Sequence, residues 1–327
     1  MRIAFAMVIT LLLSTMAQGQ STQRRDSIVA AWQGWLSENN VGQSSIAVSH
    51  QGKLVYAGGK GTSPKEAIPL ASLSKAITGA CVARLISSGA LSSSDTVGSI
   101  FASSSKVKVR NQLAAQVNVG QLLTHTSGLT PDATQKSMVG WLGSQTVRHT
   151  EASNVALARN PKSSGTYRYN NENYAILGAI IEERTGTSYE TYCDREVLAP
   201  AGVSTGRLTK PWGAFGAWGG WEMSVVDYAK FIARFYGPKG LVGRNPTAFP
   251  NADLRRGAKY GTGSLFRSSG SSFNFWHAGR HCFSKGEAGA FFASWRGGWS
   301  VVVSYNDCLG DRQVGNLDEA LANAALR

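Results

Sequence analysis

The spacing of apolar residues predicts amphipathic helices in five places along the chain. Over 26–39 the apolar residues return every three or four positions, as one buried helix face requires. These residues are Ile28, Val29, Trp32, Trp35 and Leu36. The same spacing predicts helices over 72–89, 174–184, 224–236 and 316–326.

Shorter apolar runs predict strands near both ends of the chain. SSIAVSH (44–50) and KLVYAGG (53–59) are joined at Gln51-Gly52, which predicts a hairpin. SSFNFWHAG, AGAFFASW and WSVVVSYN, within 271–306, predict three more strands, with turns over 285–287 and 296–298. The alternating segment KVKVRN (106–111) predicts an exposed strand.

Strands at both ends with helices between them predict an α/β (α+β) fold. We expect one antiparallel sheet of about five strands, flanked by N- and C-terminal helices, with an inserted mainly helical subdomain. The mixed part is expected over 26–90 and 215–327, and the helical part over 91–214. The sequence contains no internal repeat and no long low-complexity linker.

The first residues have the pattern of a secretory signal peptide. Arg2 precedes an apolar run over 3–16, and Ala17 and Gly19 are small residues at a cleavage site. The run is shorter than the ~20 residues of a membrane-spanning helix. We expect residues 1–19 to be removed, residues 20–327 to form one domain, and the product to be periplasmic or secreted, without a transmembrane anchor after processing.

The 327-residue chain has a formal net charge of +13. A basic protein can bind nucleic acid, anionic lipid or an acidic polymer such as cell wall. The Lys and Arg residues are scattered, and no nucleic-acid motif is present. A soluble basic surface without a nucleic-acid partner is therefore the first interpretation, and an anionic wall or membrane surface is the second.

Four cysteines occur without a C-x-x-C pair, which argues against zinc and thioredoxin-like sites. No cofactor or metal is predicted. Cys81 has the position of a buried helix residue. Cys282 and Cys308 flank two predicted strands and could meet as a disulfide at a sheet edge, which an exported protein permits. Reduced, packed thiols fit the sequence equally well.

Ser72-Leu73-Ser74-Lys75 opens the second predicted helix. Residues three apart lie on one helix face, so this spacing places an amine beside the Ser72 hydroxyl. A serine needs such a neighbouring base to become nucleophilic. A second S-x-x-K match, Ser103 to Lys106, enters the predicted exposed strand and is interpreted as a polar loop.

Two further segments carry candidate chemistry. Tyr169-Asn170-Asn171 precedes the 174–184 helix, so Tyr169 and Asn171 could point into a cleft, or Tyr169 could pack and Asn171 could cap the helix. His277 and Gly279 lie at the end of a predicted strand. Glycine lets a backbone or substrate approach closely, and a free strand edge could dock a substrate and stabilise an oxyanion.

In this order the three segments resemble the serine β-lactamase and penicillin-recognising family, whose motifs include S-x-x-K and K-T-G. The resemblance is strongest to its class C, DD-peptidase and family VIII esterase branch. LLTHTSGL (122–129), ENYAILGAIIEERTG (172–186) and YGTG (260–263) extend it over roughly residues 28–310. It implies a β-lactamase/transpeptidase-like fold and a serine hydrolase of a small molecule or peptide.

The resemblance assigns a role to each motif residue. Ser72 is the nucleophile that forms the acyl-enzyme, and Lys75 and Tyr169 transfer the proton. Tyrosine is a poor base at its ordinary pKa near 10, so a close lysine ammonium would have to favour the phenolate or share its proton. Asn171 holds the substrate's acyl amide or orients Lys75.

In the third motif, His277 replaces the usual basic residue, Gly279 is the family glycine, and the N–H groups of Ser72 and Arg280 form the oxyanion hole. Ala278 stands where β-lactamases commonly carry a hydroxyl, which favours a peptidase or esterase over a β-lactamase. Arg280, with His281 and Lys285 nearby, could grip an anionic substrate or simply add surface charge.

The predicted function is therefore hydrolysis of an amide or ester: a D-amino-acid peptide, a β-lactam or a small carboxylic ester. The alternative is a non-hydrolytic penicillin-binding or sensor-like protein that is acylated without turnover. A charge-driven wall-binding module is a third hypothesis.

Two other serine-hydrolase patterns compete with this assignment. The segment 202–206 matches the G-x-S-x-G elbow of α/β-hydrolases, which needs a strand before it and a helix after it. Pro200 and Pro211 disfavour both, so a surface loop is predicted. A Ser-His-Asp triad using His50, His125 or His149 has no supporting spacing, and His125 is expected to have a structural role.

Overall fold

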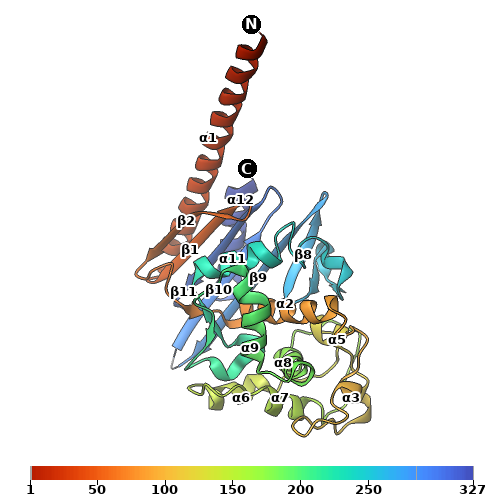
Figure 1. The fold of residues 1–327 in the computed structure, drawn as a ribbon. Coiled ribbons are helices and arrows are strands. Elements are labelled where there is room, and N and C mark those ends of the chain that lie inside the picture. The colour runs from red at the N-terminus through yellow and green to blue at the C-terminus, as the bar shows by residue number, and fades with distance from the viewer. Residues whose placement is uncertain (1, 285, 327) are drawn as a thin grey trace.

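A computed structural model describes residues 2–284 and 286–326, and for residues 2–18 the backbone alone. One eight-stranded antiparallel sheet lies at its centre, with helices on both faces (Figure 1). In spatial order the strands are β2 (Lys53–Lys60), β1 (Ser44–His50), β11 (Trp299–Tyr305), β10 (Gly286–Ser294), β9 (Ser272–Phe283), β8 (Ser264–Ser269), β7 (Lys259–Gly261) and β6 (Ala252–Asp253).

The α/β fold class is confirmed, and the sheet draws strands from both ends of the chain. The expected number of about five strands is too small, because β6, β7 and β8 extend the sheet beyond β9. Strands β6 and β7 contain only two and three residues, which is too few to show an alternating pattern. A separate small sheet pairs β3 (Ile68–Pro69), β5 (Trp221–Met223) and β4 (Arg207–Leu208).

The central strands are buried on both faces, which explains their continuous apolar sequence. In β11, Val301 and Val303 pack in one core cluster and Val302 packs in the other. The hairpin turn at Gln51-Gly52 joins β1 to β2 as predicted. The turn predicted over 285–287 includes Lys285, which lies outside the described residues.

The outer face of the sheet is covered by α1 (Arg2–Glu38) and α12 (Asp311–Leu326). Both predicted terminal helices are present, and each begins earlier than predicted. The shared core includes Ile28, Trp32, Trp35, Leu36, Leu317 and Leu321. The N-terminal part of α1 extends away from the body (Figure 1). Among the residues described, no helix combines the length and apolar character needed to cross a bilayer.

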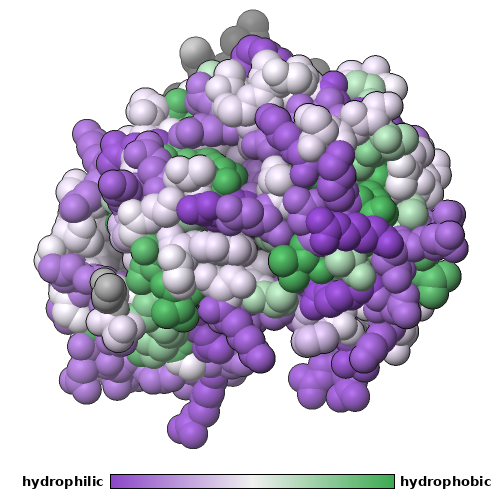
Figure 2. Space-filling view, turned by 90° about the horizontal axis from the view of Figure 1, so that it is seen from below, coloured by the Kyte–Doolittle hydropathy of each residue, from purple (hydrophilic) through white to green (hydrophobic). Residues whose placement is uncertain are grey.

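The inner face packs against α2 (Ser74–Ser87) and α11 (Val225–Phe235), and α8 (Asn171–Thr185) packs against α2 in the same core. Gly89, with φ +75°, follows the end of α2. The remaining helices are α3 (Val97–Ile100), α4 (Gln112–Ala115), α5 (Val119–Leu123), α6 (Thr134–Trp141), α7 (His149–Ala156), α9 (Tyr189–Cys193) and α10 (Gly216–Gly219). Seen from below, hydrophilic side chains are spread over this face of the molecule, and hydrophobic ones form separate patches (Figure 2).

Two local predictions can be compared directly with the chain path. The strand predicted over 106–111 is wrong: the segment is a loop, in which the buried Ser104 hydroxyl accepts from the backbone N–H groups of Lys106 and Val107. The loop interpretation of 202–206 is confirmed, since Ser204 donates to the Asp227 carboxylate and no strand precedes it.

All four cysteines are paired. Cys282 and Cys308 form the disulfide that the sequence left open. The interpretation of Cys81 as a packing residue of α2 was incomplete, because it forms a disulfide with Cys193 of α9, with 5.6 Å between the Cα atoms. The contact joins elements 112 residues apart in sequence, which helix spacing cannot reveal.

Candidate active site

The three predicted segments meet at one pocket of about 980 Å³. Ser72 enters it from the 3₁₀ turn η1 (Ala71–Leu73), Tyr169 and Asn171 from the start of α8, and residues 277–280 from β9. Lys75 lies behind Ser72, fully buried. The other walls include Gln135, Met138, Tyr167, Trp218, Gly219, Tyr260, Leu265 and Trp276.

Ser72 lies on a constrained turn. Ala71, just before it, has φ +47°, a conformation that costs a non-glycine residue free energy unless its surroundings fix it. The Tyr228 hydroxyl donates to the carbonyl of Leu73 at 3.0 Å, and the Trp221 N–H donates to Ser74 Oγ at 3.1 Å. The helix predicted from Ser72 thus begins as η1 and continues as α2 from Ser74.

The Lys75 side chain has three acceptors. Its Nζ donates to Ser72 Oγ at 3.1 Å, to Asn171 Oδ1 at 2.8 Å and to the carbonyl of Trp218 at 2.7 Å. Burial lowers the pKa of Lys75 to about 7, although the negative charge of Asp132 acts in the opposite direction. With a pKa near 7, the ammonium that donates to three acceptors can lose one proton at neutral pH, and the neutral amine then has a lone pair.

Tyr169 covers this lysine, with 4.8 Å from Lys75 Nζ to its ring centroid. The residue lines the pocket and is 41% exposed overall. Burial raises the pKa of Tyr169, and its hydrogen bond with Ser72 opposes this only in part. The phenol therefore stays protonated at neutral pH, and a phenolate favoured by the lysine is not supported.

Asn171 is the first residue of α8 and not its N-cap. The cap is Asn170, whose side chain accepts the N–H of Glu172 at 2.7 Å. The capping alternative for Asn171 is therefore wrong. Its side chain is free to accept from Lys75, and its own N–H donates to Asp132 at 2.9 Å.

His277 lies on the inward face of β9, 4% exposed. Its Nδ1 donates to the carbonyl of Ala278 at 2.7 Å. Burial and the nearby Lys75 lower the pKa of His277 to about 3, so the imidazole is neutral at physiological pH. It differs electrostatically from the cation that the family motif usually provides.

Gly279 allows β9 to approach the turn that carries Ser72. A Cβ at this position would lie 2.6 Å from the N atom of Ser72 and 2.8 Å from the carbonyl oxygen of Leu70. Such distances are too short for any side chain, so only glycine fits here. This contact brings the backbone of β9 beside the Ser72 N–H.

The Arg280 side chain turns away from Ser72. It donates to the carbonyl of Leu309 at 3.2 Å and pairs with Asp311 at 2.9 Å. His281 is bound to the carbonyl of Gly219 and stacked on Trp212. Lys285, the third cation considered, lies outside the described residues.

Of the three histidines considered for a triad, His125 lies beside the site, with 4.5 Å between its ring centroid and that of Tyr169. His125 is buried; its Nδ1 accepts the N–H of Asn170 at 3.2 Å, which confirms a structural role. His149 Nε2 accepts the N–H of Ala217, and His50 stacks on Trp299.

Sequence reasoning missed two parts of the site: the carbonyl of Trp218, which binds Lys75, and Asp132. A backbone carbonyl has no side-chain signature, and Asp132 lies in a loop without periodic pattern. Over residues 2–284 and 286–326, no group of three His, Cys, Asp or Glu side chains converges as a metal site would require.

The comparisons with known proteins agree with this geometry. The Beta-lactamase family model matches residues 37–306. Protein flp of Staphylococcus aureus is 28% identical over 179 residues, half of this chain and 34% of its own length. Penicillin-binding protein 4* of Bacillus subtilis is 33% identical over 101 residues, 28% of this chain and 21% of its length. The chain thus matches only about a third or less of these relatives.

Solved structures share the fold at low sequence identity. The octameric penicillin-binding protein homologue of Pyrococcus abyssi has a TM-score of 0.71 at 21% identity, covering 90% of this chain and 76% of its own. The D-amino acid amidase of Ochrobactrum anthropi SV3 has a TM-score of 0.69 at 18% identity, covering 91% and 99%. With the family match over residues 37–306, these comparisons establish that the chain belongs to the beta-lactamase family and has its serine hydrolase fold.

Proposed function

We propose that the protein is an exported serine hydrolase that forms an acyl-enzyme on Ser72 and hydrolyses an amide or ester bond. The observation that carries this proposal is the contact between Lys75 Nζ and Ser72 Oγ at 3.1 Å. The lysine is buried, and burial lowers its pKa to about 7. General bases work best when their pKa lies near the operating pH.

In the proposed acylation step, Ser72 Oγ attacks the substrate carbonyl carbon and its proton passes to neutral Lys75. The negative charge that forms on the carbonyl oxygen is stabilised by the N–H groups of Ser72 and Arg280, the second supplied by β9 beside η1. Each donor of this kind typically contributes ~3 kcal/mol in the transition state.

The tetrahedral adduct then expels its leaving group. The leaving nitrogen or oxygen takes a proton from the Lys75 ammonium, directly or through the Tyr169 hydroxyl, which is a phenol and so has a proton to relay. Water next attacks the acyl carbon and gives a proton to Lys75, and this proton returns to Ser72 Oγ as the ester bond breaks. Acid product and free Ser72 are released.

We place D-amino-acid amides or peptides and small esters ahead of β-lactams as substrates. Ala278 lacks the hydroxyl that helps hold a β-lactam carboxylate, and the Arg280 side chain is engaged with Asp311 and Leu309. Two solved structures with this fold are a D-amino acid amidase and a D-stereospecific amidohydrolase from Streptomyces sp..

The test is a substrate panel on the mature protein: D-phenylalanine amide, p-nitrophenyl acetate and a fluorescent penicillin. We expect turnover and a covalent adduct by mass spectrometry. Ser72→Ala should remove both, with a loss of roughly 10³-fold or more. Ser103→Ala, in the second S-x-x-K match, and Ser204→Ala are the matched controls and should leave activity intact.

The outcomes separate the remaining hypotheses. Undiminished hydrolysis by Ser72→Ala would refute the proposal. An adduct without turnover would identify the penicillin-binding or sensor-like alternative, and salt-sensitive binding to wall that ignores Ser72→Ala would identify the wall-binding module. Export is tested by the mass of the mature protein, which should begin after Gly19.

A further inference from the structure

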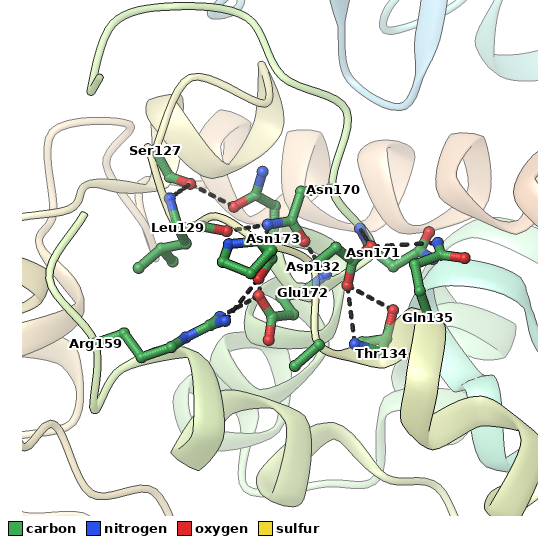
Figure 3. Close-up of polar contacts among 12 residues, drawn as sticks. Ser127, Leu129, Asp132, Thr134, Gln135, Arg159, Asn170, Asn171, Glu172 and Asn173 are labelled. Carbon is green, nitrogen blue, oxygen red and sulfur yellow. Dashed lines mark hydrogen bonds and ion pairs between the residues drawn. The ribbon is translucent and has the colours of Figure 1, made fainter. Parts of the chain in front are cut away.

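The loop between α5 and α6 is bound tightly to the start of α8 (Figure 3). Ser127 Oγ donates to Asn173 Oδ1 at 2.6 Å, and the Asn170 side chain donates to the carbonyl of Leu129. Arg159 donates to the carbonyl of Pro131 at 2.6 Å and forms an ion pair with the buried Glu172. The loop therefore has a fixed position beside the catalytic segment.

Asp132 lies at the centre of this network. Its Oδ2 accepts the N–H of Asn171 at 2.9 Å, and its Oδ1 accepts the N–H of Thr134 at 3.0 Å and the Thr134 hydroxyl at 2.7 Å. One carboxylate thus joins the first turn of α8 to the first turn of α6. Helix α6 in turn supplies Met138 to the pocket wall.

One residue, Asn171, connects Asp132 to Lys75 by hydrogen bonds. Asn171 binds Asp132 through its backbone N–H and binds Lys75 Nζ through its side-chain oxygen, at 2.8 Å. Asp132 is therefore linked through one residue to the acceptor that orients the lysine.

The charges around Lys75 single out the same carboxylate. Asp132 is the group whose charge raises the pKa of Lys75 against the effect of burial. The other titratable groups near the lysine are the rings of Tyr169 and Tyr174 and the imidazoles of His125, His277 and His281. Burial raises the pKa of both tyrosines and lowers that of the three histidines, so these five groups are neutral at pH 7.

We propose that Asp132 is a positioning residue of the Ser72 site: it fixes Asn171 against Lys75 and places a negative charge behind that pair. The inference rests on the proposed role of Lys75 as the base. Glu172, in the same network, differs because its carboxylate is paired with Arg159. It therefore provides a matched control for loss of a carboxylate.

The direct test is a pH titration of Lys75 by NMR in protein labelled with ¹³C-lysine, assigned with Lys75→Arg. We expect a pKa of about 7 in the wild type. Asp132→Asn should lower it, because the ammonium loses its negative neighbour, and Glu172→Gln should leave it unchanged. Asp132→Ser removes the same charge with less bulk and replaces Asp132→Asn if that variant does not fold.

The kinetic test uses p-nitrophenyl acetate. In Asp132→Asn the acid limb of kcat/KM should move to lower pH, and the plateau should fall on the order of 10-fold to 100-fold because Asn171 is less well positioned. Asp132→Glu keeps the charge and should restore the acid limb. Glu172→Gln should keep the wild-type limb even if its melting temperature falls.

An unchanged pKa of Lys75 in Asp132→Asn would overturn the inference. An equal shift of the Lys75 pKa in Glu172→Gln would also overturn it, because it would show that only the order of the loop matters. If the proposed function itself is wrong, a different experiment shows it. Ser72→Ala would then keep full hydrolysis, while the NMR titration would still decide the influence of Asp132 on Lys75.

Discussion

The two sides of the pocket are built differently. On the helix side, Lys75 is fully buried and its ammonium has three acceptors, all supplied by the protein. On the strand side, Ala278 and Arg280 are exposed, and the Arg280 side chain is held by Asp311, which is itself exposed. Lys75, the proposed base, is thus enclosed, whereas the strand proposed to face the substrate is open.

Physical chemistry explains the difference. Burial penalises the charge of Lys75 and lowers its pKa to about 7, which requires that the helix side exclude water. A strand binds a substrate backbone only where its edge is free. The pairing of β8 with β9 ends at Trp276, so within the described residues 277–283 pair on one side only, with β10.

The largest expected effect tests the helix side. Lys75→Met removes the base and should lower kcat/KM on the order of 10²-fold to 10⁴-fold. In the wild type, kcat/KM should fall as the pH drops below about 7, because Lys75 then becomes an ammonium and cannot accept the Ser72 proton. A pH–rate profile measures both. Lys106→Met, in the second S-x-x-K match, is the control, and an equal loss there would contradict the assignment.

An intermediate effect tests the contact between the two sides. Gly279→Ala places a Cβ 2.6 Å from the Ser72 N atom and should push β9 away from the oxyanion hole. We expect kcat/KM to fall about 100-fold, with a smaller change in KM. Gly34→Ala in α1 meets nothing within 4 Å and should keep full activity. Normal turnover by Gly279→Ala would show that β9 does not form the hole.

The smallest effect tests the open side. Arg280→Ala breaks an exposed ion pair with Asp311, which should change the free energy of unfolding by no more than about 1 kcal/mol. Because the oxyanion hole would use the Arg280 backbone N–H, hydrolysis of neutral esters should be nearly unchanged. Chemical denaturation and ester kinetics measure the two quantities. A large rise in KM confined to carboxylate-bearing substrates would instead show that Arg280 binds an anion.

Elements whose pattern repeats over a few residues could be predicted from the sequence, and elements that depend on distant contacts could not. The helix over 174–184 and the strands that became β9, β10 and β11 were predicted because their patterns repeat every few residues. β6 and β7 were missed because they are too short for a pattern. The segment 106–111 was wrongly predicted as a strand, because the backbone N–H groups of Lys106 and Val107 bond to Ser104 and not to a neighbouring strand.

The sequence by itself determined the fold class, the order of the three motifs and the Ser72–Lys75 spacing, because a helical turn fixes residues three apart without help from the rest of the chain. Only the tertiary structure decided the protonation of the site. Burial lowers the pKa of Lys75 to about 7 and that of His277 to about 3, and it raises the pKa of Tyr169. Desolvation depends on packing between segments far apart in sequence, and no local pattern encodes it.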